Sequence, residues 1–423
     1  MMHRAALTSI ATGLLLAACG PKESSTPPVA AEPAATVEET PAPETVCNYI
    51  VLIDAGSTKS RAYTYQIDTP EEGGVPTLTQ LSYAKVEPGL ASFKDSPDGA
   101  AGSITSLLTD TDSVLAKLPD ECEGKTPTAL MATAGMRLLE AQGGDAAAKA
   151  IYDSVSQAVS DTGLDLRFAG TISGQQEALY TWASANYALG NLSADQGSVG
   201  TLDLGSVATS IAFIPENGEG PTATLKFGDA SFSVYAQSYI GYGVDQARQY
   251  VADDACFPKG LAKGKGRFDQ CLMKLAPVIT PKSCDGATCG LAQPGADAKP
   301  GVPQPALPST MKFYATGHFA DTSALLKPGA ATLASLSEAA GGAKGKSGFC
   351  GTKWAKLTES NSDVPAEELE NVCFAAGWIT SVLEGYGFGR DSDQLTWTDR
   401  FGDVDSGWAL GAALCSVTGC LAG

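Results

Sequence analysis

The sequence predicts an α/β protein made of two similar halves. A pattern occurs twice in it: an apolar run of buried-strand length, an Asp-x-Gly-Ser turn, and a second apolar segment. The aspartates of the two turns, Asp54 and Asp203, are 149 positions apart, which is about the length of one domain. A chain of 423 residues is long enough for two such domains. The first copy covers residues 48–53, 54–57 and 61–67, and the second covers residues 199–202, 203–206 and 209–214.

The first residues are typical of a bacterial lipoprotein signal peptide, which we assign to residues 1–18. Arg4 gives a charged start, and an apolar stretch of signal-peptide length follows it. That stretch is too short for a transmembrane span. It ends in Leu16-Ala17-Ala18-Cys19, which resembles the lipobox in which the cysteine becomes the lipidated first residue. The alternative is an ordinary cleaved signal with a chance cysteine.

Residues 19–46 are expected to form a lipidated, disordered tether. After Cys19 the segment consists mainly of Pro, Ala, Glu, Ser and Thr, so it cannot bury enough apolar surface to offset its chain entropy. Such a tether would hold a folded domain away from a membrane. We therefore expect a lipid-anchored protein of the bacterial cell envelope, on its periplasmic or outer-membrane face.

The charge of the chain excludes nucleic acid as a partner. With 28 Lys and Arg against 47 Asp and Glu, the formal net charge is −19 and the isoelectric point is near 4.5. A surface this acidic repels phosphate backbones, so any bound phosphate must be held by local geometry or by a metal ion. The two histidines, His3 and His318, exclude a histidine-rich zinc site. We expect His318 to be structural.

The cysteines predict an oxidising compartment. Ten remain after Cys19, and an even number fits five disulfides in an exported protein. Their pairing is open, although the short loops 284–289 and 415–420 are the easiest to close. A cysteine metal site is the alternative, but no Cys-x-x-Cys pair supports it. The ten are Cys47, Cys122, Cys256, Cys271, Cys284, Cys289, Cys350, Cys373, Cys415 and Cys420.

The repeated turn has the chemistry of a phosphate-binding loop. Glycine and serine let the backbone approach an anion closely, and successive N–H groups in a tight turn can hold it. The aspartate before each turn would repel phosphate unless a divalent cation or its waters lay between them. One such turn alone is more often an ordinary turn. Two such turns facing each other predict a binding site for a polyphosphate with its metal ion.

Two further motifs lie between the repeated turns. The apolar residues 129–132 lead to Thr133, and Arg137 follows at the spacing of a helix start. Residues 172–177 lead to a segment with helical periodicity that carries Glu177 in its first turn. In isolation, Glu177 would be explained by the favourable interaction of a carboxylate with a helix N-terminus.

Taken together, the motifs resemble the apyrase conserved regions of the nucleoside triphosphate diphosphohydrolases, the family of guanosine diphosphatase and lymphocyte ecto-apyrase. The resemblance covers residues 48 to 415, essentially the whole folded part. Four motifs in the same order are much more specific than any one of them. They are residues 54–61, 132–139, 173–186 and 203–213, and residues 238–247, 256–258, 373–374, 385–388 and 408–411 resemble the later segments of the family.

The resemblance implies two duplicated actin-like (RNase H-like) domains with the active site in the cleft between them. The first domain would comprise residues 47–173 with about 403–423, and the second residues 174–402. It also implies a monomeric enzyme that hydrolyses the terminal phosphate of nucleoside tri- and diphosphates with Mg²⁺ or Ca²⁺.

Residue by residue, the resemblance implies the following roles. Glu177 would be the catalytic base, and Thr133 would contact the reacting centre. Metal-bound waters would be held by Asp54, Asp203 and Trp408. The phosphates would be bound by Gly56, Ser57, Thr58, Lys59, Gly205 and Ser206.

The sequence departs from the family at four of these or neighbouring positions. Ala208 replaces a hydroxyl residue and Ser210 a frequent glutamine, both near the metal's waters. Lys59 replaces glycine or histidine, and Ala178 replaces a common glycine. Losing one water ligand should weaken metal binding or rate without abolishing it. The substitutions at Ala208 and Ser210 keep open the alternative of a catalytically silent nucleotide-binding lipoprotein. A second alternative is an exopolyphosphatase-like enzyme of the wider actin-like group, which shares this type of phosphate loop, although the Glu177 segment and the expected export argue against it.

Overall fold

The computed structural model describes residues 47–70, 73–110, 114–193, 197–216, 218, 220–251, 253–280, 289–292, 301–343 and 345–421. All of them belong to one compact unit, residues 45–423. The signal peptide, the tether and the lipidation site Cys19 lie outside the described residues. The division into domains at residues 173 and 403 stays a prediction.

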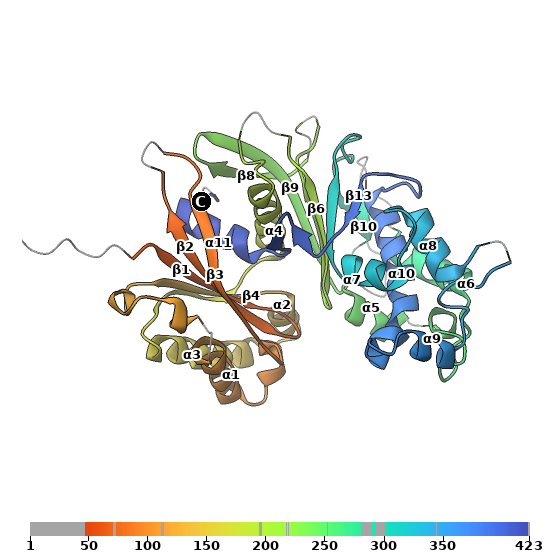
Figure 1. The fold of residues 1–423 in the computed structure, drawn as a ribbon, viewed down its shortest axis with the longest axis horizontal. Coiled ribbons are helices and arrows are strands. Elements are labelled where there is room, and N and C mark those ends of the chain that lie inside the picture. The colour runs from red at the N-terminus through yellow and green to blue at the C-terminus, as the bar shows by residue number, and fades with distance from the viewer. Residues whose placement is uncertain are drawn as a thin grey trace, which may run out of the picture. The chain divides into compact units, whose positions relative to one another are not determined.

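The first sheet has the strand order β3-β2-β1-β4-β5 (Figure 1). β1 is antiparallel to β2 and parallel to β4, so the turn after β1 and the end of β4 lie at the same edge of the sheet. The first predicted strand, turn and strand pattern is thereby confirmed. The strands are β1 (Tyr49–Ala55), β2 (Ser60–Asp68), β3 (Thr77–Val86), β4 (Pro127–Ala132) and β5 (Asp165–Thr171).

The second sheet repeats this topology. Its order is β13-β12-β6-β7-β9-β8, in which β6 is antiparallel to β7 and parallel to β12. Five of its strands, β9-β7-β6-β12-β13, correspond in order to the five strands of the first sheet. The predicted duplication is therefore confirmed. The strands are β6 (Gly200–Leu204), β7 (Ala208–Phe213), β8 (Thr222–Phe227), β9 (Ala230–Ile240), β12 (Phe313–Gly317) and β13 (Leu395–Trp397).

Helices cover both faces of each sheet, as expected for an α/β protein. In Figure 1, α1 and α3 lie on one face of the first sheet, and α4 lies between the two sheets. The helices are α1 (Pro97–Thr109), α2 (Ala134–Ala141), α3 (Asp145–Asp161), α4 (Gly174–Ala188), α5 (Val244–Val251), α6 (Phe268–Ile279), α7 (His318–Leu326), α8 (Leu333–Gly341), α9 (Trp354–Ser360), α10 (Ala366–Tyr386) and α11 (Ala409–Thr418).

Three apolar clusters hold these layers together. The central one joins strands of both sheets through α4 and α11, with Trp182 and Leu414 fully buried in it. A second cluster packs α1 and α3 against the first sheet, and a third packs α6 and α10 against the far face of the second sheet. Because the central cluster includes residues of β1 from the first sheet and of β7, β8 and β9 from the second, it fixes the two sheets relative to each other.

The described disulfides support the predicted oxidised state. They join Cys47 to Cys122, Cys256 to Cys271, Cys350 to Cys373 and Cys415 to Cys420. The predicted short loop at 415–420 is confirmed, whereas Cys284 lies outside the described residues. Short hairpins complete the fold: β10 (Cys289–Ala292) with β11 (Gly301–Pro303), and β14 (Arg400–Phe401) with β15 (Val404–Asp405). Among the described residues, no helix combines the length and apolar character needed to traverse a bilayer.

Candidate active site

The two repeated turns line one cavity of about 580 Å³. The turn between β1 and β2 brings residues 56–59 to it, and the turn between β6 and β7 brings residues 205–206. The structure thus brings together every candidate catalytic, phosphate-binding and metal residue of the sequence analysis. These are Asp54, Gly56, Ser57, Thr58, Lys59, Thr133, Glu177, Asp203, Gly205, Ser206 and Trp408. Their individual roles stay predictions.

Close backbone packing shapes both turns. A Cβ atom on Gly135, at the start of α2, would lie 2.9 Å from the Cα of Ser57. Gly317, at the end of β12, has a φ of +63°, and a Cβ there would lie 2.5 Å from the carbonyl oxygen of Leu204. Glycine is required at both positions, because a side chain would displace Ser57 in the first turn and Leu204, which directly precedes Gly205, in the second.

Glu177 is held at the start of α4 by a capping box and an ion pair. The Ser173 hydroxyl accepts from the backbone N–H of Gln176, and the Gln176 side chain accepts from the backbone N–H of Ser173. Arg137 Nη2 donates to Glu177 Oε2 at 2.6 Å, and its Nη1 donates to the carbonyl of Ile172 at 3.0 Å. The Arg137 and Glu177 side chains are only 14% and 17% exposed, so this ion pair is well shielded and fixes the carboxylate.

Asp54 is buried at the end of β1, and only one of its two carboxylate oxygens has a hydrogen-bond partner among the described residues. Its Oδ2 accepts from Arg61 Nη1 at 3.0 Å. Its Oδ1 is buried and has no hydrogen-bond partner among the described residues. Burial raises the pKa of Asp54 to about 6 against the lowering effect of Arg61, and the nearby Glu177 also raises it. A buried carboxylate oxygen without a partner fits a site built for a ligand.

Asp203 occupies the equivalent position in the second half. Its Oδ1 accepts from the Thr316 hydroxyl at 2.9 Å. Burial raises its pKa to about 6, and Glu177 again adds to the effect. Asp54, Asp203 and Glu177 therefore concentrate negative charge in one cavity that has an unpartnered buried oxygen. Within the described ranges, no group of three acidic, histidine or cysteine side chains lies close enough to coordinate a metal ion directly. The carboxylates therefore fit a hard divalent cation such as Mg²⁺ or Ca²⁺ that is held through its waters.

The structure also shows where the four residues that depart from the family pattern lie. Ala208 and Ser210 line the cavity on β7, and Ser210 lies directly opposite Asp203 in the strand register. Lys59 lines the cavity from the first turn. Ala178 is buried in α4 beside Glu177.

Sequence reasoning missed several cavity residues. Arg61 ends the first family motif and begins a predicted strand but has no predicted role, yet it forms the ion pair with Asp54 and lines the cavity. His318, expected to be structural, lines the cavity with a side chain that is 35% exposed. Thr316, which donates to Asp203, was also missed, because its place opposite Asp203 follows from the pairing of β6 with β12.

Comparison with known proteins identifies the family. A family model described as the GDA1/CD39 (nucleoside phosphatase) family matches residues 42–257 and 248–421. The chain belongs to this family. Family members are nucleoside phosphate hydrolases, so the protein is an enzyme of this class. Enzymes of the apyrase type use divalent cations such as Ca²⁺ or Mg²⁺, in agreement with the carboxylates of the cavity.

Curated relatives match over most of the chain. "Probable apyrase 3" of Arabidopsis thaliana is 28% identical over 419 residues, which cover 87% of this chain and 82% of the relative. "Ectonucleoside triphosphate diphosphohydrolase 1" of Mus musculus is 25% identical over 434 residues, which cover 88% of this chain and 81% of the relative.

A solved structure supports the fold. The crystal structure of nucleoside triphosphate hydrolases from Neospora caninum matches with a TM-score of 0.60 at 15% sequence identity, covering 87% of this chain and 92% of that chain. The predicted actin-like α/β fold is therefore confirmed.

Proposed function

We propose that the protein hydrolyses the terminal phosphate of nucleoside tri- and diphosphates by in-line attack of water, as a lipid-anchored monomer of the bacterial cell envelope. The observation that carries the catalytic part is the cavity itself. Both repeated turns and the carboxylates of Asp54, Asp203 and Glu177 line it, and Arg137 holds Glu177 in place.

The two turns would hold the phosphate groups. Ser57, Thr58 and Ser206 offer hydroxyls and backbone N–H groups, and Gly56 and Gly205 let the backbone approach the phosphate oxygens. Lys59 adds an ammonium group to the first turn. Because the protein is so acidic overall, this local set of donors is what would favour a polyphosphate in the cavity.

A divalent cation would be held through its waters. Asp54 and Asp203 would supply the carboxylate oxygens, and Trp408, the N-cap residue of α11, lines the same cavity. When bound, Mg²⁺ or Ca²⁺ supplies positive charge that offsets the charge of the phosphates.

Glu177 would act as the general base. As the water oxygen forms a bond to phosphorus, the bond from phosphorus to the bridging oxygen breaks, and the leaving nucleotide keeps that electron pair. The proton of the water passes to Glu177 Oε1, because Oε2 already accepts from Arg137. Thr133, at the end of β4, would contact the phosphoryl group that is transferred.

Phosphate release tests this function. We would measure it from nucleoside tri-, di- and monophosphates and from polyphosphate, with magnesium, calcium or chelator. General-base assistance contributes about 10²- to 10⁴-fold, so Glu177→Gln should lower turnover by at least the lower figure while nucleotide still binds. Glu359→Gln, an exposed carboxylate on α9, is the matched control. Wild-type protein that binds nucleotide without releasing phosphate, or that cleaves only polyphosphate, would contradict the proposal.

Export and anchoring are tested separately. The signal-like residues 1–18 and Cys19 motivate this part of the proposal, and the described disulfides support it, because disulfides persist in oxidising compartments. Cys19→Ala should release the protein from the membrane fraction. A chain shortened to begin at Val46 should keep full activity. If that shortened chain is inactive or insoluble, the tether assignment is wrong.

A further inference from the structure

We propose that Arg61 exchanges between two anionic partners, the Asp54 carboxylate in the metal-free protein and a phosphate group when metal and nucleotide are bound. Arg61 would thereby link metal binding to phosphate binding as a positioning residue. The inference rests on the proposed function, because it assigns a phosphate to the same cavity.

The first observation is the geometry of the ion pair. Asp54 and Arg61 are direct cross-strand partners on β1 and β2, and Arg61 Nη1 lies 3.0 Å from Asp54 Oδ2. The Asp54 side chain is only 8% exposed, whereas the Arg61 side chain is 31% exposed and lines the cavity. The carboxylate is therefore fixed, and the guanidinium has room to move.

The second observation is the oxygen that the pair leaves unsatisfied. Asp54 Oδ1 is buried and has no partner within the described part of the chain. An arginine side chain can donate to both oxygens of a carboxylate at once, but only one hydrogen bond is formed here. Asp54 therefore keeps one oxygen for another ligand in the cavity.

The second half of the molecule shows that the turn does not require this arginine. The position equivalent to Arg61 is Ser210, which lies opposite Asp203 in the same register. Asp203 accepts instead from the neutral hydroxyl of Thr316. The same strand, turn and strand unit thus forms without an ion pair, which argues against a purely structural role for Arg61.

Competition for Asp54 follows from charge alone. A divalent cation whose waters bond to Asp54 would lie close to the Arg61 guanidinium, and the two positive charges repel each other. A phosphate group removes the conflict, because the planar guanidinium binds phosphate with paired hydrogen bonds. Metal and phosphate should therefore each favour the arrangement in which Arg61 has left Asp54.

Calcium binding without nucleotide is the first test. We would titrate the full chain with Ca²⁺ by calorimetry and compare wild type with Arg61→Met. Since an adjacent opposite charge changes a carboxylate's affinity for a proton by about tenfold or more, Arg61→Met should bind calcium about tenfold more tightly. Arg61→Lys should stay near wild type. Arg400→Met removes an arginine from the Asp405 ion pair at the same cavity and serves as the matched control.

Inorganic phosphate in the presence of chelator is the second test. Arg61→Met should weaken phosphate binding on the order of tenfold, because a charge-assisted hydrogen-bonding partner is lost. Arg61→Met is thus expected to strengthen calcium binding and to weaken phosphate binding. If Arg61→Met instead damages the structure, it should weaken the binding of both calcium and phosphate, and that result would overturn the proposal. Calcium binding that does not change would also overturn it.

The origin of the effect is tested with Asp54→Asn. In that background, Arg61→Met should raise calcium affinity much less, because only the repulsion between the cation and the guanidinium remains. A gain as large as that in the wild-type background would contradict competition at Asp54. Phosphate release from nucleotides is measured on the same wild-type sample. If hydrolysis fails while both binding results hold, the proposed function is wrong and the exchange of Arg61 stands.

Discussion

Asp203→Asn is expected to stabilise the metal-free protein at neutral pH. The substitution removes a partly buried negative charge that lies near Glu177 and forms no ion pair among the described residues, although Arg61 offsets part of it. The amide oxygen can still accept from Thr316. The pKa of Asp203 is raised from 3.8 to about 6. A difference of about 2 pH units corresponds to about 3 kcal/mol, which is the upper limit of the gain in the free energy of unfolding.

The pH dependence of this gain has a defined sign. The folded protein holds the Asp203 proton more tightly than the unfolded chain, so the wild type loses stability as pH rises from 3.8 through about 6. Asparagine does not titrate and shows no such loss. The difference between variant and wild type should therefore vanish below pH 3.8, grow up to about pH 6, and stay constant above pH 7.

Denaturant unfolding in chelator, with disulfides intact, measures this difference at several pH values. Asp393→Asn is the control, because Lys312 lowers the pKa of that exposed carboxyl and its removal should not stabilise the protein. Added calcium should stabilise the wild type more than Asp203→Asn. A variant that is less stable than wild type in chelator, or a gain independent of pH, would refute the reasoning.

Two further predictions concern the base and the disulfides. Arg137→Met should lower kcat at least about tenfold with KM nearly unchanged, because Arg137 orients Glu177, and Arg137→Lys should recover part of the loss; an equal rise in KM would instead assign Arg137 to substrate binding. Thiol reagents should leave the native protein unlabelled and active, whereas reduction should lower stability by about 2–4 kcal/mol per disulfide. More than one reactive thiol in the mature, non-reduced protein would contradict the prediction of five disulfides.

The duplicated fold could be predicted because its signal is local. Each half has an apolar strand followed directly by an Asp-x-Gly-Ser turn, and such a turn restricts the backbone to few conformations. The candidate residues could be predicted for the same reason, since they sit in the turns or in the first turn of a helix. Burial of β1 and β6 then fixes where those turns lie.

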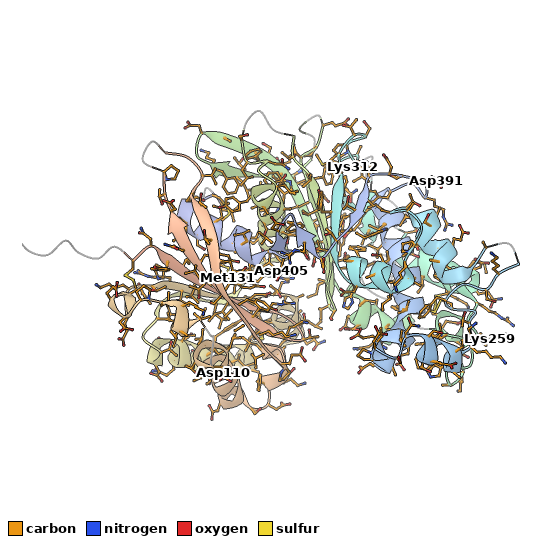
Figure 2. The ribbon with its side chains drawn as sticks, viewed as in Figure 1. Asp110, Met131, Lys259, Lys312, Asp391 and Asp405 are labelled. Atoms are coloured by element: carbon orange, nitrogen blue, oxygen red, sulfur yellow. A yellow bond between two sulfur atoms is a disulfide. The ribbon has the colours of Figure 1, made fainter. Side chains whose placement is uncertain are left out.

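The ion pairs could not be predicted in this way. Arg61 reaches Asp54 through strand register, and Arg137 reaches Glu177 across 40 positions of sequence. The hairpin β14–β15 brings Asp405 to the cavity, and Figure 2 shows this residue in the middle of the molecule, between the two sheets. Contacts of this kind depend on how separate elements pack, which periodicity along the chain does not encode.

The two halves share their topology but differ in the charge they bring to the cavity. Counted from the repeated aspartates, Lys59 corresponds to Ala208 and Arg61 corresponds to Ser210. The first half thus contributes two cations, and the second contributes two small neutral side chains, all of which line the cavity. Small side chains beside Asp203 leave space for water, whereas the cations beside Asp54 favour phosphate. The replacement of a hydroxyl residue by Ala208 should therefore weaken the binding of metal-bound water far more than it weakens the binding of the phosphates.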